Sequence, residues 1–196
     1  MTQIPEQAIQ QLFTEARTYP GWLPQDISDE TLRSIYDLMK WAPTSANLSP
    51  ARILFVKGSE AKGKLISALM PQNVDKVKAA PVTAIIAQDE EFYEQMPKLF
   101  PPGVGMIDRF RSNKEFREAT GLRNSSLQGA YFILAARALG LDCGPMSGFD
   151  NHKLDEAFFA GTTWKSNFIC NIGYGDQQSL RPRMPRLAFE EACRIV

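Results

Sequence analysis

The segment Leu127–Leu139 is apolar on almost every side, and it constrains the fold more than any other part of the chain. A surface helix keeps one polar face toward water, whereas a helix that is hydrophobic all round has to be buried. A chain of 196 residues rarely encloses a helix so completely. We therefore expect a long central helix that is covered by other elements and, in part, by a second copy of the chain.

Helical and extended segments alternate in the rest of the chain. Apolar residues recur at helical spacing from Ser28 or Asp29, both suitable helix caps, to Lys40. Residues 81–87, PVTAIIA, are apolar and β-branched enough to form a strand inside a sheet. The other expected elements are a helix at 5–17, a strand at 52–57, a helix at 59–70 capped by Ser59 and a strand at 166–175, and the helix at 29–40 should bury Leu32, Ile35, Tyr36 and Met39.

The chain is expected to form one domain, residues 1–196, because no repeat or low-complexity tract divides it. Residues 90–120, which include LFPPGVGM, predict an irregular excursion from that domain. Irregular segments on a rigid scaffold frequently carry function, so this excursion is a candidate lid or substrate-facing insertion.

Composition argues against several classes of partner. Lysine plus arginine equals aspartate plus glutamate at 22 each, which gives no sign of a nucleic-acid or acidic-membrane partner. No apolar run approaches the roughly 18 residues that span a bilayer, and no signal peptide is recognisable. The three cysteines are widely spaced, which suits a reducing compartment. A cytoplasmic protein without nucleic-acid or membrane partners is expected.

Several familiar chemistries lack their residues. The single histidine, His152, lies near a helix start and is expected to be a surface residue. GPMSGF is not a nucleophile elbow, and neither a zinc site nor a phosphate-binding P-loop has its motif. GVGMID holds only the first two glycines of the dinucleotide fingerprint and follows no strand. A nicotinamide cofactor, if used, is therefore not held in the Rossmann manner.

Two other features invite a functional interpretation. The segment WAPTSANLSPAR places small hydrogen-bonding side chains between Pro43 and Pro50, which is more polar chemistry than a plain connector needs. Basic groups that suit a phosphate recur along the chain, although each one alone is more often part of a solvated surface. These groups are Arg17 with Thr18, Lys76 with Asn73, and Arg181, Arg183 and Arg186.

Taken in order, these motifs give the chain a family resemblance. Arg17-Thr18, PTSANLSP, AARALGL, GPMSGF and RPR resemble the pattern of the FMN-dependent nitroreductase family over nearly the whole length. Within the family, MKWAPTSANLSPARI, APVTAI, RNSS, GPMSGFD and FFAGTTWKSN look most like the malonic semialdehyde reductases of uracil catabolism. The resemblance implies an α+β fold, an α/β/α sandwich with a mostly antiparallel central sheet, assembled as an entwined homodimer that binds FMN.

The resemblance also assigns roles to particular residues. It implies that Pro43, Thr44, Ser45 and Asn47 line the flavin ring and ribityl chain of the neighbouring subunit. It implies phosphate contacts from the basic pairs, ribityl and pyrimidine contacts from the Asn-x-x-Lys pair, and a turn over the flavin face. The residues in these last three groups are Arg17, Thr18, Arg181 and Arg183; Asn73 and Lys76; and Pro145, Ser147 and Gly148.

Three positions depart from the family pattern. Pro20 stands where many relatives have a second basic residue, Ser49 replaces the glutamine of the loop, and Ser147 occupies a position that is often glutamate. Each change removes charge or hydrogen-bonding reach near the flavin. General nitroreductase activity therefore does not follow from the resemblance.

The implied reaction is a ping-pong hydride transfer from NADH or NADPH through FMN to a small acceptor. Malonic semialdehyde is the expected acceptor, and nitroaromatics or quinones are the alternative. A flavin-binding module without turnover is an alternative of another class. No side chain is assigned to catalysis and no metal is expected, but Arg123 is a candidate anchor for the carboxylate of the acceptor, with a surface ion pair to Glu118 as the other interpretation.

Overall fold

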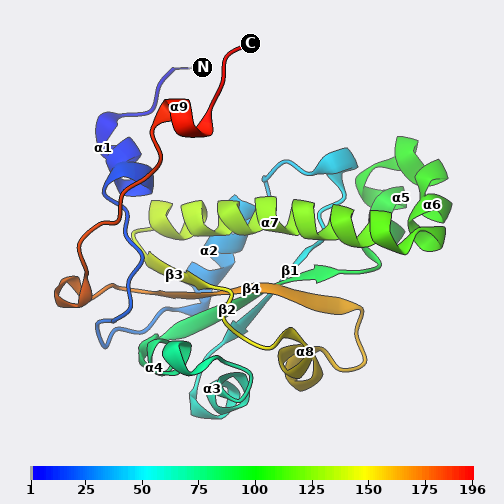
Figure 1. Cartoon of the computed structure of the whole chain (residues 1–196). Helices are drawn as coiled ribbons and strands as arrows, with labels where there is room; N and C mark the ends of the chain where they lie inside the picture. Colours follow the sequence, from blue (N-terminus) through cyan, green and yellow to red (C-terminus); the bar gives the residue numbers. More distant parts are fainter. Residues whose placement is uncertain (1) are drawn as a thin grey trace.

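A four-stranded antiparallel sheet forms the centre of the molecule, which is described by a computed structural model for residues 2–196 (Figure 1). The strands lie in the order β1-β2-β4-β3, and every neighbouring pair is antiparallel. Helices cover both faces of this sheet. The predicted α+β sandwich with an antiparallel centre is therefore confirmed. The strands are β1 (Ala51–Val56), β2 (Val82–Asp89), β3 (Asp142–Met146) and β4 (Trp164–Gly173).

Two helices, α2 (Asp29–Met39) and α7 (Lys114–Ala138), cover one face of the sheet. Their apolar side chains pack on those of the central strands, with Ile35, Ile86 and Phe132 fully buried between them. The other face carries α3 (Ser59–Ile66), α4 (Pro71–Ala79) and α8 (Asn151–Phe159) over a second core. Because β2 is covered on both sides, its side chains are apolar at successive positions rather than at alternate ones.

The start of α2 is confirmed, but its predicted buried face is partly wrong. Ser28 is the cap, since its Oγ accepts a hydrogen bond from Thr31 N at 3.1 Å. Leu32, Ile35 and Met39 form a stripe toward the core, whereas Tyr36 is 53% exposed beside it. Because this buried stripe is narrow, Tyr36 lies at its edge and is partly in contact with solvent.

The cap predicted for α3 is also wrong. Ser59 is the first helical residue, and the cap is Gly58, which makes no side-chain hydrogen bond. Gly58 has a φ of 75°, in the left-handed region that glycine enters without steric cost. The chain therefore turns sharply at Gly58, and the helix starts directly after it.

The central helix α7 is longer and less enclosed than expected. It begins at Lys114, where the side chain of Asn113 accepts from Phe116 N at 2.9 Å. Phe132 is fully buried, but Leu127 is 46% and Tyr131 39% exposed. Burial on every side is therefore wrong for the single chain, because the sheet covers only one face of α7. An apolar band remains open to solvent on its other side.

Residues 90–120 are helical rather than irregular. They contain the short segments η3 (Phe92–Gln95), α5 (Met96–Leu99), η4 (Pro101–Met106) and α6 (Ile107–Ser112). These segments share a small core of aromatic rings, in which the Phe110 ring centroid lies 5.2 Å from that of Phe92. Leu48 is buried in the same core and joins the excursion to the loop before β1. Tertiary packing of aromatics, which a local pattern does not reveal, gives this region its structure.

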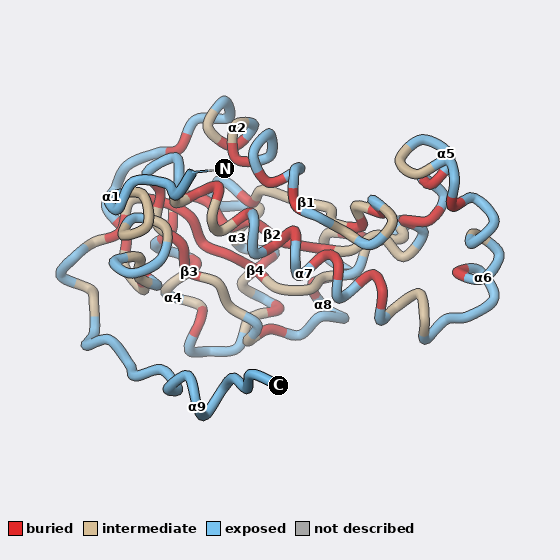
Figure 2. The backbone as a smooth tube through the Cα atoms, turned by 90° about the horizontal axis from the view of Figure 1, so that it is seen from above, coloured by how far each residue is buried: buried red, intermediate tan, exposed pale blue. Residues whose placement is uncertain are grey.

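The N-terminal segment and the C-terminal tail contact each other near Arg17 and Arg183. The N-terminal helix α1 (Glu6–Ile9) continues as a π-helical segment, η1 (Gln10–Thr14), close to the predicted range of 5–17. After η5 (Gln177–Ser179), the chain forms an extended tail with one short helix, α9 (Phe189–Ala192). Residues 181–196 are exposed throughout (Figure 2). Within the described residues, no helix is long and apolar enough to cross a membrane.

Candidate functional site

A cavity of about 800 Å³ lies between the N-terminal segment, α4, β3 and the tail. Its walls are strongly cationic, and no lining residue among the described ones is acidic. An unneutralised cluster of guanidinium groups is suited to bind a phosphate. The basic side chains that line it are Arg17, Lys76, Arg137, Arg181, Arg183 and Arg186.

Main-chain carbonyls, not carboxylates, hold three of these arginines to distant parts of the chain. Arg17 Nη2 donates to the carbonyl of Arg181 at 2.5 Å, and Arg183 Nη2 donates to the carbonyl of Ala16 at 3.1 Å. Arg137 Nη1 donates to Leu12 O at 2.9 Å. No ion pair found in residues 2–196 includes an arginine of the cavity. Their positive charge is therefore available to an anionic ligand.

The Asn73–Lys76 pair and the turn after β3 form one unit beside this cavity. Lys76 Nζ donates to Asn73 Oδ1 at 3.1 Å, and Asn73 Nδ2 donates to Gly148 O at 3.0 Å. A Cβ at position 148 would lie 2.6 Å from Asn73 Nδ2, so glycine is needed there. Pro145 lines the cavity, whereas Ser147 is exposed on the turn. The structure thus brings Lys76 and Pro145 together with Arg17, Thr18, Arg181 and Arg183 in one cavity lining. Asn73 and Gly148 lie outside the lining and are joined to it through Lys76, whereas Ser147 does not line the cavity.

The loop between α2 and β1 lies elsewhere. Ser45 N donates to Asn124 Oδ1 at 2.8 Å, in the first half of α7, and Asn47 Nδ2 donates to Leu99 O at 2.9 Å. Arg137, which lines the cavity, is thirteen residues further along α7 than Asn124, or about 20 Å at 1.5 Å per residue. Within one chain, the predicted loop residues Pro43, Thr44, Ser45 and Asn47 do not line the cavity.

The loop has an unusual backbone. Ala46, Asn47 and Ser49 have φ values of 48°, 52° and 42°. Left-handed conformations cost on the order of 1 kcal/mol for residues other than glycine, although asparagine tolerates them better. Inside the loop, Thr44 Oγ1 accepts from Ser49 N at 3.1 Å. Such a conformation persists only where the surroundings hold it.

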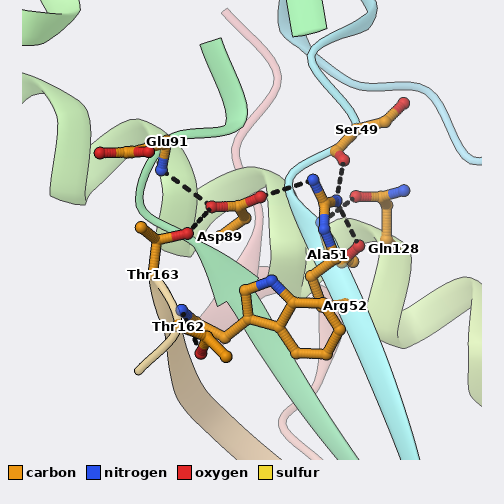
Figure 3. A network of polar contacts seen from close by, with 9 residues as sticks. Ser49, Ala51, Arg52, Asp89, Glu91, Gln128, Thr162 and Thr163 are labelled. Carbon is orange, nitrogen blue, oxygen red and sulfur yellow. Dashed lines mark hydrogen bonds and ion pairs between the residues drawn. The ribbon is translucent and has the colours of Figure 1, made fainter. Parts of the chain in front are cut away.

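A polar network at the end of the loop supplies part of this hold (Figure 3). Arg52 Nη2 donates to Asp89 Oδ2 at 2.7 Å, and Arg52 Nη1 donates to Ser49 O at 3.1 Å. The other carboxylate oxygen of Asp89 accepts from Thr163 Oγ1 at 2.6 Å. From the side of α7, Gln128 Oε1 accepts from Ala51 N at 2.8 Å. The network joins the loop to β2, β4 and α7.

Comparison with known proteins identifies the family. Residues 17–174 match the sequence description of the nitroreductase family. The chain belongs to the nitroreductase family. It is 54% identical over 193 residues to a protein of Rhodopseudomonas palustris (strain TIE-1), with 98% of both chains covered. It is 59% identical over 191 residues to one of Polynucleobacter asymbioticus, with 97% of both covered. Both relatives carry the provisional name NADH dehydrogenase/NAD(P)H nitroreductase.

The fold agrees with this membership. A nitroreductase from Exiguobacterium sibiricum, also provisionally named and crystallised in complex with FMN, superposes with a TM-score of 0.81 at 20% identity, covering 100% of both chains. The predicted nitroreductase family and the predicted oxidoreductase class are confirmed. The names of these relatives do not mention malonic semialdehyde, so this acceptor stays a prediction.

Several residues that line the cavity or hold the loop were not predicted. Arg137 lies in the block AARALGL, which carries part of the family resemblance. An arginine at this place in the sequence could equally line a cavity or face solvent. Asn124 and Gln128 gave only a weak signal, as two amides one turn apart on α7, and their burial became evident only in the fold. The ion pair between Arg52 and Asp89 could not be predicted, because it depends on the pairing of β1 with β2.

The prediction for Arg123 is corrected in part. Arg123 is an exposed residue near the middle of α7, not at its start, because the helix already begins at Lys114. Glu118 pairs with Lys114 at 3.6 Å instead of with Arg123. Arg123 does not line the arginine-rich cavity of its own chain. If Arg123 anchors the acceptor, it would therefore do so in a site that is formed together with another chain.

Burial affects the ionisation of two groups, Asp142 and the cavity residue Tyr19. It raises the pKa of the Asp142 carboxyl, against the opposing effects of a hydrogen bond from Gly175 N and the charge of Arg137. Burial also raises the pKa of Tyr19, and the Asp142 carboxylate adds to this shift. Tyr19 accepts a hydrogen bond from Gln177 Nε2 at 2.6 Å. Asp142 is outside the cavity lining but close enough to Arg137 for the two charges to interact.

A second hollow of about 780 Å³ lies between β2, the start of α7 and the start of β4. Its lining carries both signs of charge, including Glu90, Arg117, Glu118 and Lys165. Because these charges partly neutralise each other, this hollow is less suited to a phosphate-bearing ligand than the arginine-rich cavity.

Proposed function

We propose that this protein is an FMN-dependent NAD(P)H oxidoreductase, active as a homodimer, that reduces a small carbonyl compound such as malonic semialdehyde. The observation that carries the proposal is the cavity with arginines and no lining acid, in a chain of the nitroreductase family. FMN brings a phosphomonoester of nearly two negative charges at neutral pH, which the cavity can neutralise.

The residues of the cavity fit such a ligand. Arg17 and Arg183 enter from opposite ends of the chain, and each leaves donor groups free beyond its bond to a main-chain carbonyl. We assign both to the phosphate, with Thr18 and Arg181 beside them and Arg137 as a further cation. Six basic side chains exceed what one phosphate needs, so the remaining positive charge favours an anionic donor molecule as well.

The other side of the cavity fits the polar edge of a flavin. We assign Asn73, Lys76 and the turn Pro145–Gly148 to this edge, since they form one hydrogen-bonded unit next to the cavity. The charge of Lys76 would favour extra electron density on a nearby ring. When bound, FMN supplies the redox chemistry, taking a hydride from NADH or NADPH and passing it to the acceptor.

A second chain is needed to complete this site. The loop 43–49 and the cavity lie at opposite halves of α7, about 20 Å apart. We assign Pro43, Thr44, Ser45 and Asn47 to the flavin site of the neighbouring subunit. The exposed apolar band of α7, with Leu127 and Tyr131, is suited to the dimer interface because it would otherwise face water.

The acceptor is inferred from two features. The subgroup-like blocks, such as FFAGTTWKSN, favour malonic semialdehyde. In addition, the exposed Ser147 on the turn leaves space and brings no charge where many relatives have glutamate, so an acceptor with a carboxylate is not repelled. Nitroaromatic compounds or quinones are the alternative acceptors, in keeping with the names of the relatives.

An anaerobic half-reaction experiment tests the proposal. The FMN-loaded protein is mixed with NADH or NADPH, and bleaching of the flavin absorbance is followed. Malonic semialdehyde, a nitrofuran and a quinone are then added separately to the reduced protein. We expect bleaching and fastest reoxidation by malonic semialdehyde. Bleaching with reoxidation only by the nitrofuran or quinone would support the alternative acceptors, and failure to bleach would indicate a module without turnover.

A further inference from the structure

We propose that Asn124 and Gln128 of α7 are positioning residues for the flavin site: they hold the second half of the loop between α2 and β1, from Ser45 to Ala51, in the shape that FMN binding requires. The proposal deepens the proposed function and rests on it. Neither residue is expected to touch FMN, so both would act through the backbone of the loop.

The geometry of the two amides is matched to the loop. They are four residues apart on α7 and therefore on one face of the helix. Both are almost fully buried, at 1% and 4% exposure. Asn124 Oδ1 accepts from Ser45 N and Gln128 Oε1 accepts from Ala51 N, each at 2.8 Å. The two bonds pin the second half of the loop on both sides, at Ser45 and at Ala51.

The strained residues lie between these two pins. Ala46, Asn47 and Ser49, with φ values of 42–52°, would favour other conformations in a free chain. A loop with fixed ends has fewer alternatives to relax into. If either pin is removed, the loop gains conformations that do not present its side chains to the flavin, and the ordering entropy has to be supplied on binding.

Burial alone does not account for the arrangement. A buried backbone N–H needs an acceptor, and a water molecule or a shorter polar side chain would also satisfy it. Here the two acceptors come from one rigid helix, and Asn124 is itself oriented by donating to Thr120 O at 2.8 Å. The distance between the two acceptors is therefore fixed by α7. The position of α7 along the sheet in turn determines the shape of the loop.

The test compares variants that remove or keep the acceptor. Gln128→Met and Asn124→Leu remove it at similar volume, whereas Gln128→Glu keeps an oxygen for Ala51 N. Ser125→Ala is the matched control, because Ser125 is buried on the same helix and accepts from Asn167 Nδ2 at 2.9 Å but makes no hydrogen bond to the loop. For each, FMN affinity, the flavin absorbance spectrum and the melting temperature of the FMN-free protein are measured.

We expect Gln128→Met and Asn124→Leu to weaken FMN binding about tenfold each and to shift the flavin spectrum. Gln128→Glu should restore the spectrum and most of the affinity, and Ser125→Ala should leave both unchanged even where it lowers the melting temperature. Unchanged FMN affinity in Gln128→Met overturns the proposal; if this variant does not fold, unchanged affinity in Asn124→Leu overturns it. Failure of the unaltered protein to bind FMN would instead overturn the proposed function.

Discussion

The guanidinium of Arg52 lies 2.7 Å from the carboxylate of Asp89, and the two side chains are only 23% and 13% exposed. The pair joins β1 to the end of β2 at the point where the loop between α2 and β1 returns to the sheet (Figure 3). Arg52 also donates to two main-chain carbonyls, and Asp89 also accepts from Thr163 and from Glu91 N. One ion pair therefore organises three segments of the chain.

Replacing Arg52 with alanine should destabilise the protein by about 2 kcal/mol, because Asp89 would be left mostly buried without its cation. Urea unfolding of the FMN-free protein measures this loss. Lys40→Ala is the control, since the Lys40–Asp37 pair is equally short at 2.6 Å but solvent-exposed. A loss no larger than that of the control would contradict a structural role for Arg52.

Replacing Arg183 with alanine should weaken FMN binding by about 1.5–3 kcal/mol, since a charge-assisted bond to phosphate is lost. Fluorescence titration with FMN measures the change. The fold should persist, because Arg183 is exposed in the tail. Arg33→Ala, an exposed arginine outside the cavity, is the control. Unchanged affinity would show that the RPR run is only a solvated surface.

The protein should be an obligate homodimer. The exposed apolar band of α7 and the separation of loop from cavity both require a partner surface, and such interfaces frequently bury more than about 2,000 Å² in total. Sedimentation or size-exclusion chromatography of dilute protein checks the assembly state. A monomer that retains tightly bound FMN would falsify the shared-site arrangement.

Replacing Arg123 with alanine should lower kcat/KM for malonic semialdehyde by at least about tenfold, since an anchor for the carboxylate would be lost. The rate with an uncharged quinone should change little. Because Arg123 is exposed and outside any ion pair found in the described residues, its removal should not alter the melting temperature. Equal losses with both acceptors would mean that the residue supports the fold.

Replacing Asp142 with asparagine should stabilise the protein at pH 7. Burial raises the folded-state pKa of this carboxyl, so folding favours its protonated form and the ionised form carries a penalty at neutral pH. The stability difference should shrink as the pH falls and vanish below the unfolded value near 3.8. Thermal unfolding of both proteins across pH 3–8 measures this difference. A variant that is less stable than the unaltered protein at neutral pH would contradict the prediction.

Much of the fold follows from local patterns in the sequence. The strand at 82–89 and the helix at 29–39 were predicted nearly to the residue, because burial on both faces and a serine cap leave clear signatures. Strand β3 was missed, since GPM reads as a turn. A proline is tolerated in β3 because this is an edge strand, where the missing N–H of Pro145 need not pair.

The site was less accessible to sequence reasoning. Arg17 and Arg183 meet from opposite ends of the chain, and only the family resemblance connected them beforehand. Gln128 lies in the segment Leu127–Leu139, which was interpreted as apolar on almost every side, and Asn124 lies just before it. Tertiary pairing, which a local window does not contain, decides such positions.

The length of α7 also has an evolutionary meaning. If loop and cavity meet only between chains, every copy supplies half of two different sites, and neither half is selected alone. A chain with a defective loop and a chain with a defective cavity would together restore one whole site, which the flavin content of a co-expressed mixed dimer would reveal. Inherited changes at the two ends of this helix are therefore expected to accumulate as compatible pairs.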